Sequence, residues 1–407
     1  MKTEFHRINR LPPYVFAEVN AMKARARAAG EDIMDLGMGN PDLPTPKHIV
    51  DKLCEVAQDP KAHRYSASQG IKGLRKAFVG YYQRRFGVEL DMNKEVCVTL
   101  GSKEGLANLA SAITNPGDLI LAPNPAYPIH PFGFIIADGT VRSLPCEPDD
   151  EFLAALELAV RNSTPKPTAL ILNYPSNPTA KVASLDFFGQ VVDFCKHHGI
   201  FILSDLAYAE IYFDIEPPPS VLQIPGAKDI AVEFTSMSKT YSMPGWRVGF
   251  AAGNPFLMNA LIRIKSYLDY GAFTPVQVAA ATALNGPQDC VAEARQIYKE
   301  RRDILVEGLE QAGWSIPNPQ ASMFAWAPIP EPFKHLGALE FSKLLLTEAK
   351  VAVSPGTGFG ENGEGYVRIA LVENKHRIRQ AVRNIRTFFG NAGTALENAE
   401  KKRAAAS

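Results

Sequence analysis

Short apolar segments alternate with helical stretches through the middle of the chain, and this rhythm constrains the fold more than any other feature. The apolar segments lie at residues 95–100, 118–123, 168–175, 199–208, 231–238 and 246–253. Amphipathic stretches such as residues 184–199 lie between several of them. Strands that alternate with helices are typical of a mostly parallel sheet with helices on both faces. The pattern therefore predicts a large α/β/α domain.

The rhythm changes from about residue 288. The expected elements there are a long charged helix at 290–312, strands near 321–328 and 351–354, a helix at 338–350, a strand at 366–371 and a helix at 374–389. This order predicts a smaller α+β domain. We expect the large domain at residues 46–287, the small domain at 1–45 and 288–390, and a flexible tail at 391–407.

The composition of the chain disfavours several kinds of binding partner. Lys plus Arg and Asp plus Glu number 43 each, so no global charge recruits nucleic acid or an anionic membrane. No run of 18 apolar residues predicts a membrane span, and the N-terminal residues lack the apolar core of a signal peptide. Five scattered cysteines predict reduced thiols, and the histidines show no metal-ligand spacing. We therefore expect a cytoplasmic protein with no metal, nucleic-acid or membrane partner.

Polar residues follow several apolar segments at the point where each predicted strand ends. Ligands gather at the carboxyl ends of the strands in an open parallel sheet. Gly101, Ser102 and Lys103 come after the first segment and before a helix. Free N–H groups at a helix start favour a phosphate, although a glycine in this place also serves ordinary turn geometry.

An amide and a carboxylate follow the next two strand ends. Asn177 lies in a loop that its neighbouring prolines stiffen, and a plain turn would look the same. Asp205 ends an apolar segment, with Tyr208 three residues on. Burying a carboxylate there requires a partner, unless the residue only caps a helix.

Lys239 lies in the segment FTSMSKTYSMPGWRVGF, after Ser236 and Ser238 and before Arg247. Alone, it would read as a surface lysine in a loop. Together with the turn, the asparagine and the aspartate, it matches the needs of one cofactor. Pyridoxal phosphate carries a phosphate, a phenolic oxygen, a pyridine nitrogen and an aldehyde that condenses with lysine.

From GMGNPD near residue 40 to YVRIAL near residue 370, the chain resembles the class I/II, fold-type I pyridoxal-phosphate aminotransferases. The spacings from Asn177 to Asp205 (28), on to Lys239 (34) and to Arg247 (8) are similar to that family's. Segments such as SKEGLA, PNPAYPIH and IKSYLDYGAFTP are most similar to its bacterial glutamate–pyruvate members. The resemblance implies amino transfer between glutamate and pyruvate, in support of alanine biosynthesis. An aspartate, aromatic, methionine or diaminopimelate aminotransferase, or a β-lyase, remains the alternative.

The resemblance also implies roles for individual residues. Lys239 would bond to the cofactor's aldehyde carbon and then carry the substrate's proton. Asp205 would pair with the pyridine nitrogen, while Asn177 and Tyr208 would bind the phenolic oxygen. Tyr127 would stack on the ring.

Two further groups of residues are implied by the same resemblance. The phosphate would be held by Ser102, Lys103, Ser236, Ser238 and Arg247. The substrate would be bound by Arg368, Gly39 and Asn177, and Arg368 would take its α-carboxylate. Tyr65 and Thr274 would reach the phosphate of a neighbouring subunit, which implies a homodimer with shared active sites.

The chain departs from the family pattern at Ala180, where glycine is usual, and we expect a negative φ there. Tyr14, Phe16 and the 264–275 loop are expected to line the space for the substrate side chain. No second arginine for a distal carboxylate follows that loop, which disfavours a dedicated aspartate enzyme.

Two other classes of protein are disfavoured. A regulator with an aminotransferase-like sensor would need a DNA-binding module before residue 40, and the residues there are few and not strongly basic. A nicotinamide-binding enzyme would need a GxGxxG turn, which the first helix of the sheet region lacks.

Overall fold

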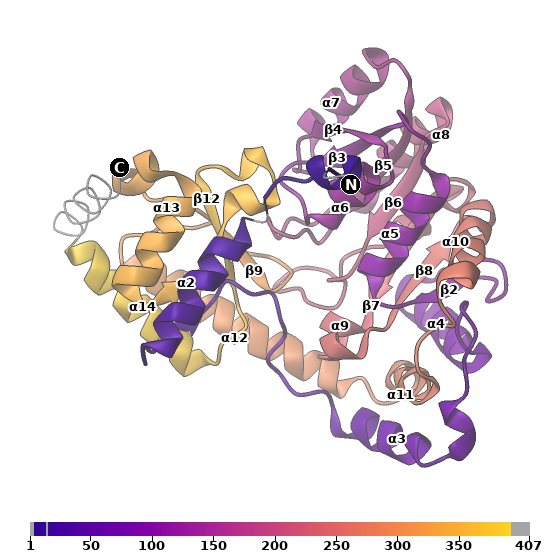
Figure 1. The fold of residues 1–407 in the computed structure, drawn as a ribbon, viewed down its shortest axis with the longest axis horizontal. Coiled ribbons are helices and arrows are strands. Elements are labelled where there is room, and N and C mark those ends of the chain that lie inside the picture. The colour runs from indigo at the N-terminus through magenta and orange to yellow at the C-terminus, as the bar shows by residue number, and fades with distance from the viewer. Residues whose placement is uncertain (1–3, 14, 392–407) are drawn as a thin grey trace.

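A seven-stranded sheet forms the middle layer of the larger part of the computed structural model, which describes residues 4–13 and 15–391 (Figure 1). In the order β2-β8-β7-β6-β5-β3-β4, its strands are Val96–Thr99, Gly249–Gly253, Ala231–Ser236, Phe201–Asp205, Pro167–Asn173, Leu119–Pro123 and Thr140–Leu144. Each of the six apolar segments contains or overlaps one of these strands. The sequence pattern missed β4, because this edge strand is largely uncovered and reads TVRSL, without an apolar run.

The sheet is mostly parallel, as the sequence predicted. Strands β3 to β7 run parallel to one another, whereas β8 runs antiparallel to both β7 and β2. The carboxyl ends of β2, β5, β6 and β7 therefore lie at the same edge as the start of β8. This arrangement brings residues before β8 to the edge where the other strands end.

Helices cover both faces of the sheet, because successive side chains along each strand point to opposite faces and both sets are largely apolar. In β5, Ala169 and Ile171 pack with one apolar cluster, while Leu170 and Leu172 pack with the other. The first cluster contains residues of α5 (Ser102–Ile113), α6 (Ile129–Ile136) and α10 (Pro255–Leu268). The second contains residues of α3 (Lys47–Ala57), α4 (Lys72–Phe86), α7 (Asp150–Arg161), α8 (Leu185–His198) and α11 (Thr274–Asn285). The fold is thus the three-layered α/β/α sandwich that was expected.

A second group of elements lies beside the sheet and has its own apolar cluster (Figure 1). It comprises α2 (Phe16–Ala28), β1 (Met34–Asp35), α12 (Asp289–Gln311), β9 (Phe324–Pro328), α13 (Gly337–Leu344), β10 (Val351–Ala352), β11 (Ser354–Pro355), β12 (Tyr366–Ala370) and α14 (Lys375–Gly390). Strands β11, β12 and β9 form an antiparallel sheet, and β1 pairs in parallel with β10. A short helix α1 (His6–Asn9) precedes these elements, and a short helix α9 (Met237–Thr240) follows β7.

Details of this second group differ from the sequence pattern. The helix expected at 338–350 is α-helical only to Leu344, continues as a π-helical turn, Leu345–Ala349, and ends at Lys350 in a left-handed conformation. The strand expected at 351–354 is two short strands. The domain boundaries stay a prediction, and the tail predicted at 391–407 lies outside the described residues from position 392 onward. No helix within the described residues is long and apolar enough to cross a membrane.

Candidate active site

A cavity of about 400 Å³ opens where the strand ends of the large sheet face the second group of elements. Its lining brings together twelve of the residues that the sequence nominated for the cofactor and the substrate. These are Gly39, Ser102, Lys103, Tyr127, Asn177, Asp205, Tyr208, Ser236, Ser238, Lys239, Arg247 and Arg368. Tyr65 and Thr274, nominated for the phosphate of a neighbouring subunit, are not among the lining residues. The cavity has the size and mixed polar and apolar lining of a small-molecule site.

Lys239 enters the cavity from α9, directly after β7. The side chain of Ser236 caps this short helix by accepting a hydrogen bond from the backbone N of Ser238 at 3.1 Å. The lysine Nζ donates to the carbonyl oxygen of Gly39 at 2.8 Å. Burial, followed by the positive charges of Arg368 and Arg247, lowers the pKa of Lys239 to about 8, against the opposing charge of Asp205. Roughly one molecule in ten then carries a neutral, nucleophilic amine at pH 7.

Asp205 ends β6 and lies buried in the cavity wall. Its Oδ2 accepts a hydrogen bond from His130 Nε2 at 3.0 Å, and its Oδ1 accepts from the backbone N of Ala207 at 3.3 Å. Asn173 Nδ2 donates to the Asp205 carbonyl oxygen at 2.8 Å. The carboxylate is thus held in one orientation, as an electrostatic partner for a bound cation must be.

The sequence reasoning missed His130. This histidine lies fully buried near the start of α6, in the apolar stretch IHPFGFII, and no spacing within the chain connects it to Asp205. Its place follows from the crossover between β3 and β4, which carries α6 over the sheet. The histidine does lie within the segment PNPAYPIH, which resembles the family, and this resemblance was the only sequence feature that could have indicated its place in the site.

Arg368 lies in the cavity wall formed by β12, and it is only 6 % exposed. Its Nη1 donates to Asn177 Oδ1 at 2.7 Å, and its Nη2 donates to the carbonyl oxygen of Gly37 at 3.1 Å. The guanidinium carbon lies 4.0 Å from the ring centroid of Phe324 and 4.5 Å from that of Phe359. The two rings and the hydrogen bonds hold the guanidinium in place, and its planar fork is suited to binding a carboxylate.

The turn after β2 forms a cradle for an anion with Arg247. Gly101 has φ +84, and a Cβ there would lie 2.3 Å from Arg247 Nη2. A Cβ on Gly249 would lie 2.6 Å from the backbone N of Ser102. Arg247 donates to the carbonyl oxygens of Pro244 at 2.9 Å and Leu100 at 3.1 Å. Glycines thus let a guanidinium approach the start of α5, where free N–H groups favour a phosphate.

The expectation of a negative φ at Ala180 is wrong, because its φ is +60. The loop from Ser176 to Lys181 closes on itself: the backbone N of Ser176 donates to the Lys181 carbonyl at 2.9 Å, and the backbone N of Ala180 donates to the Ser176 carbonyl at 3.1 Å. Closing both bonds within so few residues requires a left-handed residue, and Ala180 is buried in that position.

Tyr65 and Thr274 lie away from the cavity in the single chain. Tyr65 is 86 % exposed, and its ring centroid lies 4.7 Å from that of Tyr270. Phe16 does line the cavity, and its ring packs edge-on against Phe359 at 5.4 Å. Among the described residues, none of the 264–275 loop lines the cavity, contrary to expectation. Tyr14 lies outside the described residues.

Comparison with known proteins places these features in a family. Residues 31–385 match the family of class I and II aminotransferases, and the chain belongs to it. Members of this family depend on pyridoxal phosphate. The fold is fold-type I, and the structure of BacF from Bacillus subtilis is similar, with a TM-score of 0.88 and 34% identity over 96% of this chain and 98% of that one.

Curated relatives are similar over nearly their whole length. AatC of Rhizobium meliloti, an aminotransferase by name with no substrate stated, is 66% identical over 97% of this chain and 98% of its own. The glutamate-pyruvate aminotransferase AlaC of Escherichia coli is 54% identical over 95% of this chain and 93% of its own. The LL-diaminopimelate aminotransferase of Moorella thermoacetica is 43% identical over 95% and 98%, respectively.

The donor set of the cavity fits pyridoxal phosphate. The Gly101 cradle with Arg247 suits a dianionic phosphate, and the oriented carboxylate of Asp205 suits a protonated ring nitrogen. Lys239 lines the same cavity with a lowered pKa, which suits bonding to an aldehyde. The cavity therefore offers a partner for the phosphate, the ring nitrogen and the aldehyde of the cofactor.

Proposed function

We propose that this aminotransferase moves an amino group between glutamate and pyruvate, giving alanine and 2-oxoglutarate, and so supports alanine biosynthesis. The observation that carries the proposal is the 54% identity to AlaC, named as a glutamate-pyruvate aminotransferase, over 95% of this chain. The cavity supports it, because one buried arginine, Arg368, offers a carboxylate site that amino acids and 2-oxo acids can share.

Pyridoxal phosphate, when bound, supplies an aldehyde that condenses with amines and a protonated ring that takes up electrons from the substrate's Cα. In our proposal Lys239 would bond to that aldehyde carbon, and an incoming amino acid would free its amine. The free amine would then take the proton from the substrate's Cα and hold it for return in the second half of the transfer. A pKa near 8 suits both tasks, because the amine accepts and releases a proton close to neutral pH.

The remaining residues bind and orient. Asp205 keeps the ring nitrogen protonated, and His130 keeps Asp205 oriented. Asn177 and Tyr208 bind the phenolic oxygen, and burial raises the pKa of the Tyr208 hydroxyl, so it acts as a neutral donor. Tyr127 stacks on the ring. The phosphate is assigned to Ser102, Lys103, Ser236, Ser238 and Arg247.

Substrate binding is assigned to Arg368, with Gly39 and Asn177 beside it. The side chain of the amino acid would face α2, which lines the cavity with Phe16, Val19 and Asn20. Apolar surface there suits the methyl group of alanine, and the amide of Asn20 suits the distal carboxylate of glutamate. This mixture supports two substrates that differ in the polarity of the side chain.

Another amino acid substrate is the alternative that an observation favours. Relatives named as LL-diaminopimelate aminotransferases are 43% identical to this chain. The aspartate and aromatic alternatives have weaker support, from solved structures so named that are 27% and 29% identical to this chain. No similar observation favours the methionine or β-lyase alternative.

The experiment is a set of half-reactions with the purified holoenzyme under one condition. Alanine, glutamate, aspartate, an aromatic amino acid and LL-diaminopimelate are compared by the rate at which each converts the bound cofactor. We expect alanine and glutamate to react fastest, and 2-aminobutyrate to react at a reduced rate, since each added methylene changes binding by only about 0.8 kcal/mol. A tenfold preference for any of the other three over alanine retires the alanine assignment.

We propose that the active unit is a homodimer in which Tyr65 and Thr274 complete the partner's phosphate site. Support comes from an exposed apolar face around Tyr65, which also includes Tyr267, Leu268, Tyr270 and Phe273. Such a patch is typical of an interface.

The protein is proposed to act in the cytoplasm, because its five cysteines form no disulfide. The two proposed domains are residues 46–287 and residues 1–45 with 288–390.

A further inference from the structure

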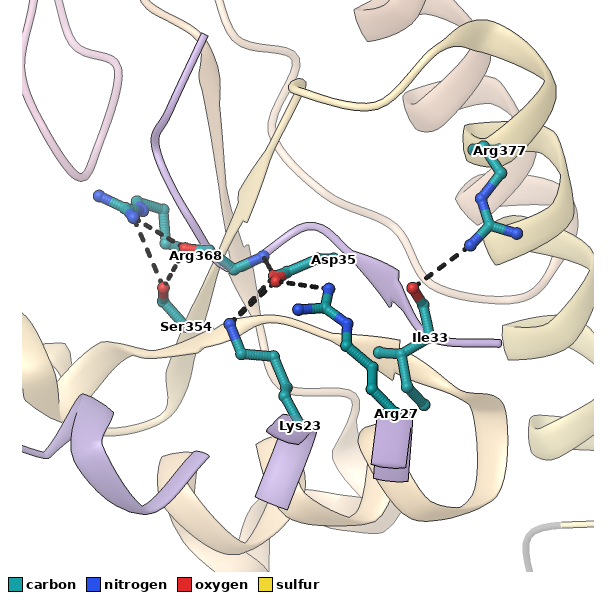
Figure 2. A network of polar contacts seen from close by, with 8 residues as sticks. Lys23, Arg27, Ile33, Asp35, Ser354, Arg368 and Arg377 are labelled. Carbon is teal, nitrogen blue, oxygen red and sulfur yellow. Dashed lines mark hydrogen bonds and ion pairs between the residues drawn. The ribbon is translucent and has the colours of Figure 1, made fainter. Parts of the chain in front are cut away.

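A series of polar contacts joins the N-terminal helix α2 to Arg368 (Figure 2). Lys23 of α2 places its Nζ 3.0 Å from Asp35 Oδ2. Asp35 Oδ1 accepts a hydrogen bond from the backbone N of Gly37 at 3.2 Å, and the carbonyl oxygen of Gly37 accepts from Arg368 Nη2 at 3.1 Å. We propose that Lys23 is a positioning residue that fixes Arg368 for the substrate's α-carboxylate through Asp35 and Gly37. The inference rests on the role proposed for Arg368.

Gly37 transmits the contact because it is held on both sides. Its carbonyl oxygen also accepts a hydrogen bond from Ser354 Oγ at 2.6 Å. A Cβ on Gly37 would lie 3.4 Å from Asp35 Oδ1 and from the backbone of Val353, at van der Waals contact, so Asp35 and Val353 pack beside this residue. Having no side chain of its own to anchor it, Gly37 keeps its place through Asp35 on one side and Ser354 on the other. If the Asp35 carboxylate is displaced, the Gly37 carbonyl oxygen, which accepts a hydrogen bond from Arg368, therefore moves with it.

Lys23, and not the neighbouring Arg27, supplies the buried partner of Asp35. Arg27 Nη2 lies 3.1 Å from Asp35 Oδ2, but its side chain is 51% exposed, whereas that of Lys23 is 7% exposed. Exposed ion pairs contribute little, while a buried charge that loses its partner is strongly destabilised. Without the Lys23 ammonium, Asp35 would follow Arg27 toward solvent and release the Gly37 amide.

The same lysine also attaches α2 to the rest of the protein. Val19 and Lys23 are the buried residues of this helix among those described, and both line the cavity with Phe16 and Asn20. The helix therefore covers the site with few apolar anchors of its own. In this proposal the ion pair between Lys23 and Asp35 both fixes the position of α2 over the cavity and maintains the orientation of Arg368.

A different role for Lys23 would be direct contact with the substrate side chain, since the lysine lines the cavity. The two roles predict different substrate dependence. Direct contact with a distal carboxylate affects glutamate and leaves alanine unchanged. Positioning of Arg368 affects every amino acid equally, because all of them carry the α-carboxylate.

The test compares Lys23→Met, Lys23→Arg and the matched control Arg27→Gln as holoenzymes. The ligand is 2-methylalanine, which has an α-carboxylate but no hydrogen on Cα to lose, and its affinity is measured by calorimetry. We expect Lys23→Met to bind it about 10- to 100-fold more weakly, as small displacements in a binding site do. Lys23→Arg should recover most of that loss, and Arg27→Gln should stay within about fivefold of wild type.

Two further readouts separate positioning from general damage. In Lys23→Met the KM values for alanine and glutamate should rise by the same factor, with a smaller change in kcat. Hydrogen exchange of the peptide that contains Gly37 and Gly39 should accelerate in Lys23→Met and not in Arg27→Gln. If Lys23→Met does not fold, Lys23→Gln, which keeps a donor without the charge, replaces it in the same comparison.

Two outcomes overturn the proposal. One is an unchanged affinity for 2-methylalanine in a folded, neutral Lys23 variant. The other is a loss confined to glutamate, which makes Lys23 a side-chain contact. The wild-type half-reactions report on the proposed function separately: a preference for another amino donor retires the glutamate–pyruvate assignment, while the Lys23 proposal stands or falls on the α-carboxylate alone.

Discussion

His130 Nε2 lies 3.0 Å from Asp205 Oδ2, and both side chains are buried. Because this nitrogen donates to the carboxylate, the proton of a neutral imidazole resides on Nε2. Nδ1 is buried and has no hydrogen-bond partner among the described residues. The histidine thus contacts the site through Asp205, whose carboxylate it holds toward the cavity, and through the ring of Tyr127, whose centroid lies 5.8 Å from its own.

Asp205→Asn should retain bound pyridoxal phosphate but lose most transamination, because a neutral amide no longer keeps the ring nitrogen protonated. Removing one oriented electrostatic partner costs on the order of 100- to 1000-fold in rate. His130→Phe removes only the donor to Asp205, so we expect a loss of about tenfold. Single-turnover rates with alanine measure both. A near-normal rate in an Asp205→Asn enzyme with its full complement of cofactor would show that another group keeps the ring nitrogen protonated.

Lys239 should be the lysine that bonds to the cofactor. Borohydride reduction of the holoenzyme should add the mass of the cofactor to the peptide that contains SMSKTYSM. Lys265 is the internal control, because it is fully buried between Glu104 at 2.8 Å and Asp269 at 2.9 Å. Burial alone would lower the pKa of Lys265, but hydrogen bonds to both carboxylates outweigh it and raise that pKa. A label on Lys265 would contradict the assignment.

The attachment of pyridoxal phosphate to apoenzyme should follow the titration of Lys239. Its pKa of about 8 lies below that of an ordinary lysine, because burial and two arginines disfavour the charged form. The neutral amine is the nucleophile, so the rate should rise with pH and level off above about 8. Stopped-flow mixing between pH 6 and pH 9.5 measures this. A rate that keeps rising tenfold per pH unit to the end of that range would show that the lysine is not perturbed.

Arg368→Lys should weaken both half-reactions to the same extent, because alanine and glutamate share the α-carboxylate. Lysine keeps the charge but lacks the planar fork and the second donor that reaches Gly37. Losing a charge-assisted hydrogen bond costs about 1.5–3 kcal/mol, or roughly 10- to 100-fold in kcat/KM. An effect on one substrate alone would place Arg368 at the substrate side chain instead.

Glu233 predicts a pH dependence of stability that is independent of catalysis. It is fully buried, where it accepts hydrogen bonds from Tyr82, Ser204, Ser220 and the backbone N of Val221. Burial raises the pKa of this carboxyl above its ordinary value of 4.5, in spite of those donors. The folded state therefore holds the proton more tightly than the unfolded state does.

Stabilisation from the Glu233 proton is complete below pH 4.5 and is lost as pH rises through the folded pKa. Glu233→Gln cannot titrate, so its free energy of unfolding should fall less than that of wild type over this interval. Urea unfolding at a series of pH values measures the difference. Identical pH profiles for the two proteins would mean that Glu233 ionises as easily in the fold as in the unfolded chain.

The sequence could predict the strands and most of the site, because both depend on local pattern. Apolar runs such as 168–175 form buried strands, and polar residues that follow parallel strands meet at one edge of a sheet. Arg247 belongs to this edge only because β8 is antiparallel, a fact of strand pairing that the sequence pattern does not contain. The left-handed conformation of Ala180 likewise comes from loop closure and not from the residue type.

Contacts between distant segments lay beyond sequence reasoning. His130 reaches Asp205 through the packing of a crossover helix. Lys23 is connected to Arg368 only through Asp35 and Gly37, in a segment whose backbone is hydrogen-bonded to Ala352 and Ala370. A buried histidine in an apolar stretch and a lysine in an N-terminal helix are ordinary residues until the tertiary fold gives them neighbours.

The pairing of β1 with β10 also orders events on the ribosome. Met34 is made early and Val351 late, and the two strands can align only after most of the chain has emerged. The residues from Ser102 to Arg247 that we propose as the cofactor site are all synthesised well before Arg368. Translation therefore completes the proposed cofactor side of the cavity before it supplies the arginine proposed to recognise the amino acid.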